Sequence, residues 1–320
     1  MALPALLSRL RLPLIGAPLF IVSVPELVIA QCCAGVVGSL PALNARPSAE
    51  LDDWLSQIRQ ALADWDAAHP QTPAAPFAVN LIVHRGNPRL QQDLALCQKH
   101  AVPLLITSLG AQPEVNQAAH GWGGLVLHDV IDDRFARKAI DKGADGLIAV
   151  AAGAGGHAGR LSPFALVQEI RAWFDGPLAL AGAIASGDAV LAAQAIGADL
   201  AYCGSPFIAT TEARAAAVYK QMLVDGSSAD IVGSALFTGI WGNYLRGSIV
   251  AAGLDPEHLP DPDPGLDVGA LLAGNQAWKD IWGCGQGIAA VDAVLPAAEL
   301  VARLQRQYQA ARQRLCAGGA

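Results

Sequence analysis

The sequence predicts an α/β protein built as a (β/α)8 barrel of the TIM type, with an added C-terminal helical region. Two observations predict this fold. Short, almost continuously apolar runs recur eight times before about residue 206, as strands buried on both faces do. Helical stretches lie between most of these runs, and that alternation is typical of parallel α/β folds. The length of 320 residues and the hydrophobic content of 53% allow one large core.

The eight apolar runs are the predicted strands. They span residues 12–18, 35–40, 77–83, 102–109, 124–130, 146–152, 177–184 and 200–206. The helices expected between them span residues 25–33, 48–65, 88–100, 132–142, 163–174 and 187–197. An open doubly wound sheet is the alternative. It would favour a G-x-G-x-x-G turn after the first strand, where the chain instead has IGAPLF.

The pattern changes after residue 222. Residues 224–253 read as helical with glycine and aromatic breaks, residues 254–267 as an acidic, proline-rich loop, and residues 288–315 as one long helix. We therefore expect a barrel over residues 1–222, a helical and loop insertion over the barrel mouth at 223–287, and a C-terminal helix at 288–320 that packs back on the barrel. Apolar stretches near 236–250 suggest a homodimer.

Composition excludes several classes of function. The net charge is −7, Lys and Arg total 21, and no basic stripe is present, so nucleic acid is not an expected partner. Pro13, Pro18 and Pro25 interrupt the apolar N-terminal stretch, which argues against a signal peptide. The uncharged stretch between Glu26 and Arg46 is long enough for a membrane span, but its polar, glycine and proline residues argue against one; they are Gln31, Gly35, Gly38, Pro41 and Asn44. Six cysteines without metal-ligand spacing indicate reduced thiols in a cytoplasmic protein, and no metal site is predicted.

The active site of such a barrel lies at the carboxyl ends of the strands. The loops after the seventh and eighth predicted strands read AGAIASGD and CGSPF. Small residues there let phosphate oxygens approach backbone N–H groups, as barrels of this type commonly do at these two positions. We therefore predict a phosphate site at Gly182, Ala183, Gly204 and Ser205. Neither loop contains Lys or Arg, so the backbone alone would hold the phosphate.

The stretch GAGGHAG (153–159) follows the sixth predicted strand. Bare backbone at Gly155 and Gly156 allows close approach to a flat ring, and His157 could then take a proton from a carbon atom above that ring. A flexible loop with a surface histidine is the alternative. His128, beside Asp129 at the end of the fifth strand, competes for a place in the site; a structural hydrogen bond in the barrel mouth is its alternative role.

Six motifs, in this order, resemble the nitronate monooxygenase family, formerly called 2-nitropropane dioxygenases. They are GAP (16–18), PFAVNL (76–81), AGGHAG (154–159), AGAI (181–184), GADLAYCGSPFIAT (197–210) and WGCGQGI (282–288). The resemblance covers nearly the whole chain. It implies a TIM barrel that binds FMN and an added helical region.

The resemblance also implies an activity and a set of site residues. The activity is the oxidation of small alkyl nitronates, extended to nitroalkanes, by O2 to a carbonyl compound and nitrite. His157 would be the catalytic base. The residues implied or expected to contact FMN are Ala17, Pro18, Asn80, His128, Gly155, Gly156, Gly182, Ala183, Gly204, Ser205 and Gln286.

Five positions depart from the family pattern. A Gln and a Glu expected before A-G-G-H are Val150 and Gly153, and the Arg of G-T-R-F is Pro206. The second Gly of A-G-G-I is Ala183, and the usual Met after A-P is Leu19. These changes remove polar groups and leave two alternatives open. One is an FMN-dependent NAD(P)H:quinone or enoyl-thioester reductase on the same scaffold. The other is a role without redox chemistry, as a phosphate-ester enzyme or a binding protein.

Overall fold

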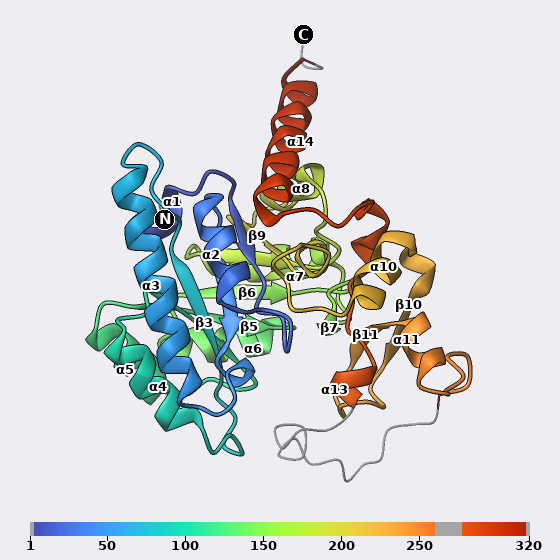
Figure 1. Ribbon diagram of the computed structural model, residues 1–320, viewed down its shortest axis with the longest axis horizontal. Coiled ribbons are helices and arrows are strands. Elements are labelled where there is room, and N and C mark those ends of the chain that lie inside the picture. Colours follow the sequence, from blue (N-terminus) through green and yellow to red (C-terminus); the bar gives the residue numbers. More distant parts are fainter. Residues whose placement is uncertain (1–2, 260–276, 318–320) are drawn as a thin grey trace.

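Eight parallel strands close into a barrel in the computed structural model, which describes residues 3–259 and 277–317 (Figure 1). The strands are β1 (Leu14–Gly16), β2 (Gly38–Pro41), β3 (Phe77–Ile82), β4 (Leu104–Ser108), β5 (Leu125–Val130), β6 (Gly146–Val150), β8 (Leu178–Ala181) and β9 (Leu200–Cys203). Their order is β1-β9-β8-β6-β5-β4-β3-β2, and a parallel bridge between Ile15 and Val37 closes the ring. The predicted barrel is confirmed, and closure excludes the open sheet.

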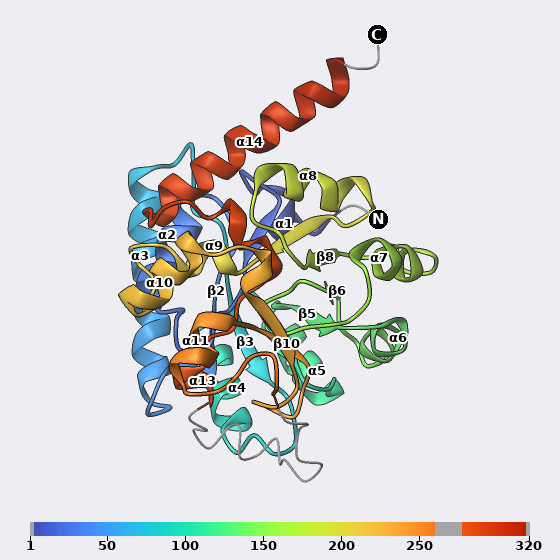
Figure 2. The same cartoon turned by 90° about the vertical axis from the view of Figure 1, so that its right-hand side faces the viewer.

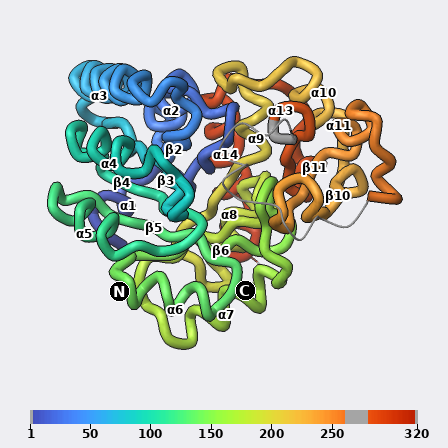
Figure 3. Tube along the Cα trace, turned by 90° about the horizontal axis from the view of Figure 1, so that it is seen from below, coloured from blue at the N-terminus to red at the C-terminus, as the bar shows by residue number. Residues whose placement is uncertain are grey.

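Helices surround this ring, as the view from below shows (Figure 3). They are α2 (Pro25–Cys33), α3 (Glu50–Ala68), α4 (Leu90–Lys99), α5 (Pro113–Gly121), α6 (Asp133–Asp141), α7 (Pro163–Arg171) and α8 (Gly187–Ala195). Six of them match the predicted helices. The seventh, α5, was missing from the prediction because Val115 is the only large apolar side chain that it buries.

The strands are buried on both faces, as their continuous apolar runs predict. Side chains such as Ile15, Ile106 and Ile148 fill the barrel interior. The short helix α1 (Ala5–Ser8) adds Leu7 to the same cluster, where it is 1% exposed. The N-terminal segment therefore packs into the barrel core.

The prediction of helix for residues 224–253 is largely wrong. Strands β10 (Ile231–Ser234) and β11 (Gly242–Leu245) pair antiparallel, and β11 also pairs with the two-residue strand β7 (Gly156–His157). The helical parts of this range are the end of α10 (Ala217–Asp225), a 3-10 turn at Ser228–Asp230 and α11 (Arg246–Ala251), which lies beside these strands to one side of the barrel (Figure 1). Strand β11 forms on a partner about 85 residues away, which local periodicity cannot reveal.

Residue 222, where the pattern of the sequence changes, lies inside α10 (Ala217–Asp225), which follows α9 (Ser205–Ile208). Near residues 236–250, the apolar side chains of Phe237, Tyr244 and Ile249 are buried in one cluster, which removes most of the surface that suggested a dimer. The part of the expected acidic loop from residue 260 onward lies outside the described residues.

The C-terminal helix begins later than predicted. A 3-10 turn covers Gln286–Ala290, and α14 spans Ala297–Ala317 behind Pro296; the four-residue α13 (Ala277–Asp280) precedes both. Figure 2 shows α14 crossing the molecule beside α8. The two helices touch at Gly187, where an added Cβ would meet the backbone of α14. None of the helices described is both long enough and apolar enough to cross a bilayer.

Candidate active site

Two cavities open at the carboxyl end of the barrel. The first, of about 240 Å³, is lined by the loops after β1, β6, β8 and β9 and by Trp282, Gly283, Gly285 and Gly287; we call it the glycine-lined cavity. The second, of about 330 Å³, is lined by the ends of β3, β4 and β5 and by the loop after β2; we call it the apolar cavity. Six residues line both cavities: Pro18, Phe20, Asp129, Val150, His157 and Tyr202. They form a shared wall.

The loops after β8 and β9 present backbone donors to the glycine-lined cavity. Among the described residues, no group accepts a hydrogen bond from the N–H of Gly182, Ile184, Gly204 or Ser205, and all four residues line this cavity. Ala183 also lines it, but its N–H donates to the Gly153 carbonyl at 3.2 Å. The loops therefore lie where the sequence predicted them, and the N–H of Ile184, rather than that of Ala183, has no acceptor among the described residues.

Close packing explains the glycine that stands two residues before His157. A Cβ on Gly155 would lie 2.6 Å from the Gly285 nitrogen, so only glycine lets the C-terminal segment approach. Gly155 and Gly156 still line the glycine-lined cavity. Gln286 does not line this cavity. Its backbone N–H donates to the Gly153 carbonyl at 2.9 Å, and the residue is exposed. Of the expected cofactor contacts, Gln286 is the one that lines neither cavity.

Strand β7 positions His157 in the shared wall, paired with Gly242 of β11. Its Nε2 lies 3.2 Å from the Thr238 hydroxyl. When that hydroxyl donates its proton to the Ile240 carbonyl at 3.0 Å, it accepts from Nε2–H, and Nδ1 is then the basic ring nitrogen. Burial lowers the pKa of His157 to about 4, so the ring is neutral at neutral pH.

His128 lies in the apolar cavity with its Nδ1 2.7 Å from the Thr107 hydroxyl. Burial, reinforced by the nearby charge of Lys142, lowers its pKa to about 4. The structural hydrogen bond that was the alternative role is present. A ring held in this way can still contact a ligand, but it lines only one of the two cavities.

A chain of hydrogen bonds links the ends of β3, β4 and β5. The Asn80 Nδ2 donates to the Ile106 carbonyl at 3.0 Å and to Ser108 Oγ at 2.8 Å. Ser108 Oγ then donates to Asp129 Oδ2 at 2.5 Å. Burial raises the pKa of the Asp129 carboxyl to about 6, although the Ser108 hydrogen bond opposes that shift.

Sequence reasoning assigned no role to Asp129 and missed Tyr202. Tyr202 lies on β9 in the shared wall, and burial raises its pKa well above the usual value, so its hydroxyl stays protonated. The signal that could have found it is a polar ring inside the apolar run LAYCGSP. In the parts of the chain that the structure describes, no cluster of three His, Cys, Asp or Glu side chains could hold a metal ion.

The loop after β1 carries Ala17 and Pro18 along the glycine-lined cavity, and a buried asparagine holds it there. Asn44 accepts from the Ile21 N–H at 2.8 Å and donates to the carbonyls of Leu19 and Ser23. Ile21 has a φ of 58°, a left-handed conformation that is rare for a β-branched residue. The hydrogen bonds of Asn44 stabilise that conformation.

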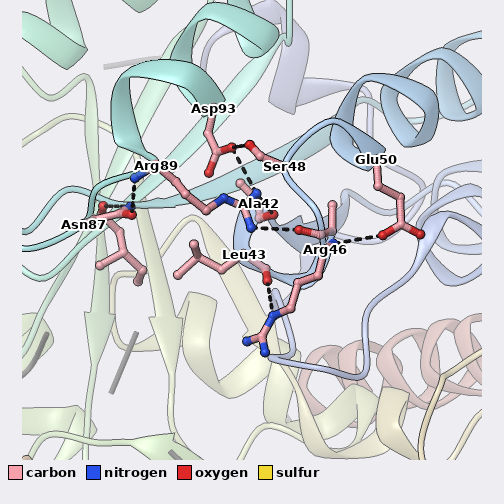
Figure 4. Close-up of polar contacts among 10 residues, drawn as sticks. Ala42, Leu43, Arg46, Ser48, Glu50, Asn87, Arg89 and Asp93 are labelled. Atoms are coloured by element: carbon pink, nitrogen blue, oxygen red, sulfur yellow. Dashed lines mark hydrogen bonds and ion pairs between the residues drawn. The ribbon is translucent and has the colours of Figure 1, made fainter. Parts of the chain in front are cut away.

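Arg89 in turn holds the loop that carries Asn44 (Figure 4). Its guanidinium donates to the carbonyls of Ala45 at 2.8 Å and Ala42 at 3.0 Å, and it pairs with Asp93 at 3.0 Å. Ser48 donates to the same Asp93 oxygen at 2.8 Å. The Asp93 side chain is 1% exposed, so this is a buried ion pair.

Comparisons with known proteins agree with this geometry. A family model described as nitronate monooxygenase matches residues 5–307. The chain is 30% identical to a nitronate monooxygenase of Paraburkholderia phytofirmans, over 93% of this chain and 92% of that one, and 27% identical to one of Pseudomonas aeruginosa, over 95% and 98%. Two solved structures are similar in fold, each with a TM-score of 0.81 and 24% identity. They are FabK from Thermotoga maritima (98% of this chain, 97% of that one) and a nitroalkane oxidase from Streptomyces ansochromogenes (97% and 100%).

Proposed function

Because the chain belongs to the nitronate monooxygenase family, we propose that it is an FMN-dependent enzyme that oxidises small alkyl nitronates with O2 to a carbonyl compound and nitrite. Neutral nitroalkanes are its slower substrates. One observation carries the proposal: the neutral imidazole of His157 lies in the wall between two cavities, one of which is lined by four backbone N–H groups without acceptors among the described residues.

The glycine-lined cavity fits the phosphate of FMN. Four backbone N–H groups without partners among the described residues, at Gly182, Ile184, Gly204 and Ser205, line a cavity with small side chains. Convergent N–H groups of this kind bind anions without a cation. Asn80 can contribute only its Oδ1, as an acceptor, because its two N–H groups already have partners. Ala17, Pro18, Gly155 and Gly156 would flank the flavin ring, and FMN would supply the redox chemistry.

His157 handles the proton of a neutral substrate in this proposal. An imidazole that is neutral above about pH 4 can accept a proton at Nδ1 from the carbon next to a nitro group. Thr238 holds the tautomer that this requires. A nitronate arrives already deprotonated, so its turnover depends less on His157. Ile131, Phe135 and Ile240 line the apolar cavity, which suits an alkyl group.

An anaerobic spectrum tests the proposal. The purified protein, loaded with FMN, is mixed in separate samples with an alkyl nitronate and with NADH, and free FMN serves as the control. Reduction of the bound flavin by the nitronate, and not of free FMN, is the expected result. Rapid reduction by NADH alone would instead favour the reductase. A bound flavin that neither compound reduces would contradict both functions.

A further inference from the structure

Asp129 presents a carboxyl group to the cavities at the barrel mouth. The function proposed above gives this group no role. It lines both cavities, at the end of β5. Among the described residues, Ser108 is its only hydrogen-bond partner, and no Lys, Arg or His forms an ion pair with it. A half-buried carboxyl without a paired cation is costly, which makes such a group a candidate for a role in the site.

The hydrogen-bond chain determines which carboxyl oxygen can carry a proton. Asn80 donates to Ser108 Oγ, so the single hydroxyl proton of Ser108 points to Asp129 Oδ2. Oδ2 is therefore an acceptor, and a proton on the carboxyl lies on Oδ1. The residue keeps intermediate exposure at the barrel mouth, on the side where both cavities lie. Oδ1 is thus available to a ligand.

The groups that face Asp129 leave its charge uncompensated. Ser108 on β4 and Val150 on β6 are uncharged, and Tyr202 on β9 stays protonated. His157 on β7 and His128 on β5 are neutral above about pH 4, because burial lowers the pKa of each.

The loops add one cation. Pro18 and Phe20 follow β1, and Arg46 follows β2. Arg46 is exposed at the cavity rim, with its guanidinium 5.4 Å from the centre of the Phe20 ring. Among the described residues that line the apolar cavity, Arg46 is the only one with a permanent positive charge, and water screens it there.

We propose that protonated Asp129 donates a hydrogen bond from Oδ1 to an oxygen of the anionic substrate, and that ionised Asp129 repels this anion. The identity of the anion, a nitronate, rests on the proposed function. Hydrogen bonds between a neutral acid and an anion are strong in a site shielded from water, and like charges there are strongly unfavourable. Asp129 then decides, through its own protonation, whether the site accepts the substrate.

The pH dependence follows. The pKa of Asp129 is raised to about 6, so the carboxyl is protonated below about pH 6 and ionised above it. The kcat/KM for a preformed nitronate should be constant at lower pH and then fall about tenfold per pH unit, reaching roughly a hundredth of its plateau two units above the pKa. A loss of kcat/KM as the pH rises is the behaviour of a group that must be protonated.

Two variants test this assignment. In Asp129→Asn, an amide of the same shape cannot ionise, so the fall in kcat/KM above about pH 6 should disappear. In Ser108→Ala, the donor that stabilises the ionised carboxyl is lost, so the fall should move to higher pH. A merely structural role for either residue would change the activity without moving the profile. An unchanged fall in an active Asp129→Asn enzyme would overturn the inference.

A second readout does not depend on turnover. In protein labelled with carbon-13 at the aspartate carboxyls, the resonance that is absent from Asp129→Asn should titrate near pH 6, and at higher pH in Ser108→Ala. Titration below about pH 4 would overturn the inference. A failure of the proposed function would give a different result from a failure of this inference. The Asp129 resonance would still titrate near pH 6, but the wild-type enzyme would consume no nitronate at any pH. That result would reject the nitronate as the ligand.

Discussion

Two histidines at the barrel mouth, His128 and His157, both have a lowered pKa, but they occupy different positions in the site. The ring of His128 contacts Thr107 and lines only the apolar cavity. His157 lines both cavities, and Thr238 determines which of its nitrogens is basic. Burial alone therefore does not distinguish the proposed base, His157, from a histidine with a structural role; its position in the shared wall supports the proposal. That position makes His157 the residue whose loss should separate neutral from anionic substrates.

Replacement of His157 by alanine should slow the oxidation of a neutral nitroalkane by about 10²–10⁴, since general-base catalysis contributes roughly that factor. Turnover of the preformed nitronate should change much less, because no proton has to be removed. Steady-state oxygen consumption with both forms of one nitro compound measures the difference. His120→Gln, an exposed histidine paired with Asp145, is the matched control. Equal losses on both substrates would remove His157 from the proton transfer.

At the scale of elements, a buried ion pair on α4 supports the cavity wall through two loops. Arg89 and Asp93 hold the turn that follows β2 (Figure 4). Asn44 in that turn holds the loop after β1. Each step is a hydrogen bond to backbone, so displacement of one loop would displace the next. The strained φ of Ile21 lies at the end of this series.

Arg89→Met should destabilise the protein by about 3–5 kcal/mol, because it leaves the buried Asp93 without its cation. Equilibrium unfolding in urea measures the loss as a lower midpoint. Arg85→Met is the control: Arg85 is exposed on the same connection, and a surface change should stay within about 0.5 kcal/mol. A destabilisation of similar size in both variants would show that the buried pair has no special role.

At the scale of the whole molecule, the barrel brings together two neighbouring strand ends, which form the proposed phosphate site without a charged side chain. No Lys or Arg lies in either loop, and α9 begins at Ser205, directly after β9. The donors are backbone groups that the closed sheet positions, so the site depends on the integrity of the fold more than on any one side chain.

Thermal unfolding of the apoprotein should therefore distinguish FMN from riboflavin. A ligand at about 100 times its Kd stabilises the native state by about 2.7 kcal/mol, which is several degrees in Tm. FMN should produce this shift, and riboflavin at the same concentration a clearly smaller one, because it lacks the phosphate. Raising the salt concentration should change the FMN shift little. Equal shifts for the two flavins would contradict a phosphate site at these loops.

The sequence alone determined the eight strands, six of the surrounding helices, the position of the two glycine-containing loops after β8 and β9, and the position of His157 after β6. Each of these follows from a short contiguous pattern, since a βα unit is built from neighbouring residues. The roles of the site residues stay predictions. The resemblance to a family added the expectation of FMN, which no local pattern contains.

Only the tertiary structure decided what surrounds His157. Its pairing with β11, its contact with Thr238 81 residues away, and the approach of Gly285 to Gly155 all join segments far apart in the chain. The same holds for Asp129 and Tyr202, which meet in one wall because the sheet closes. Periodicity and composition report the burial of a residue, but not its partner, because partners are chosen by the packing of the completed fold.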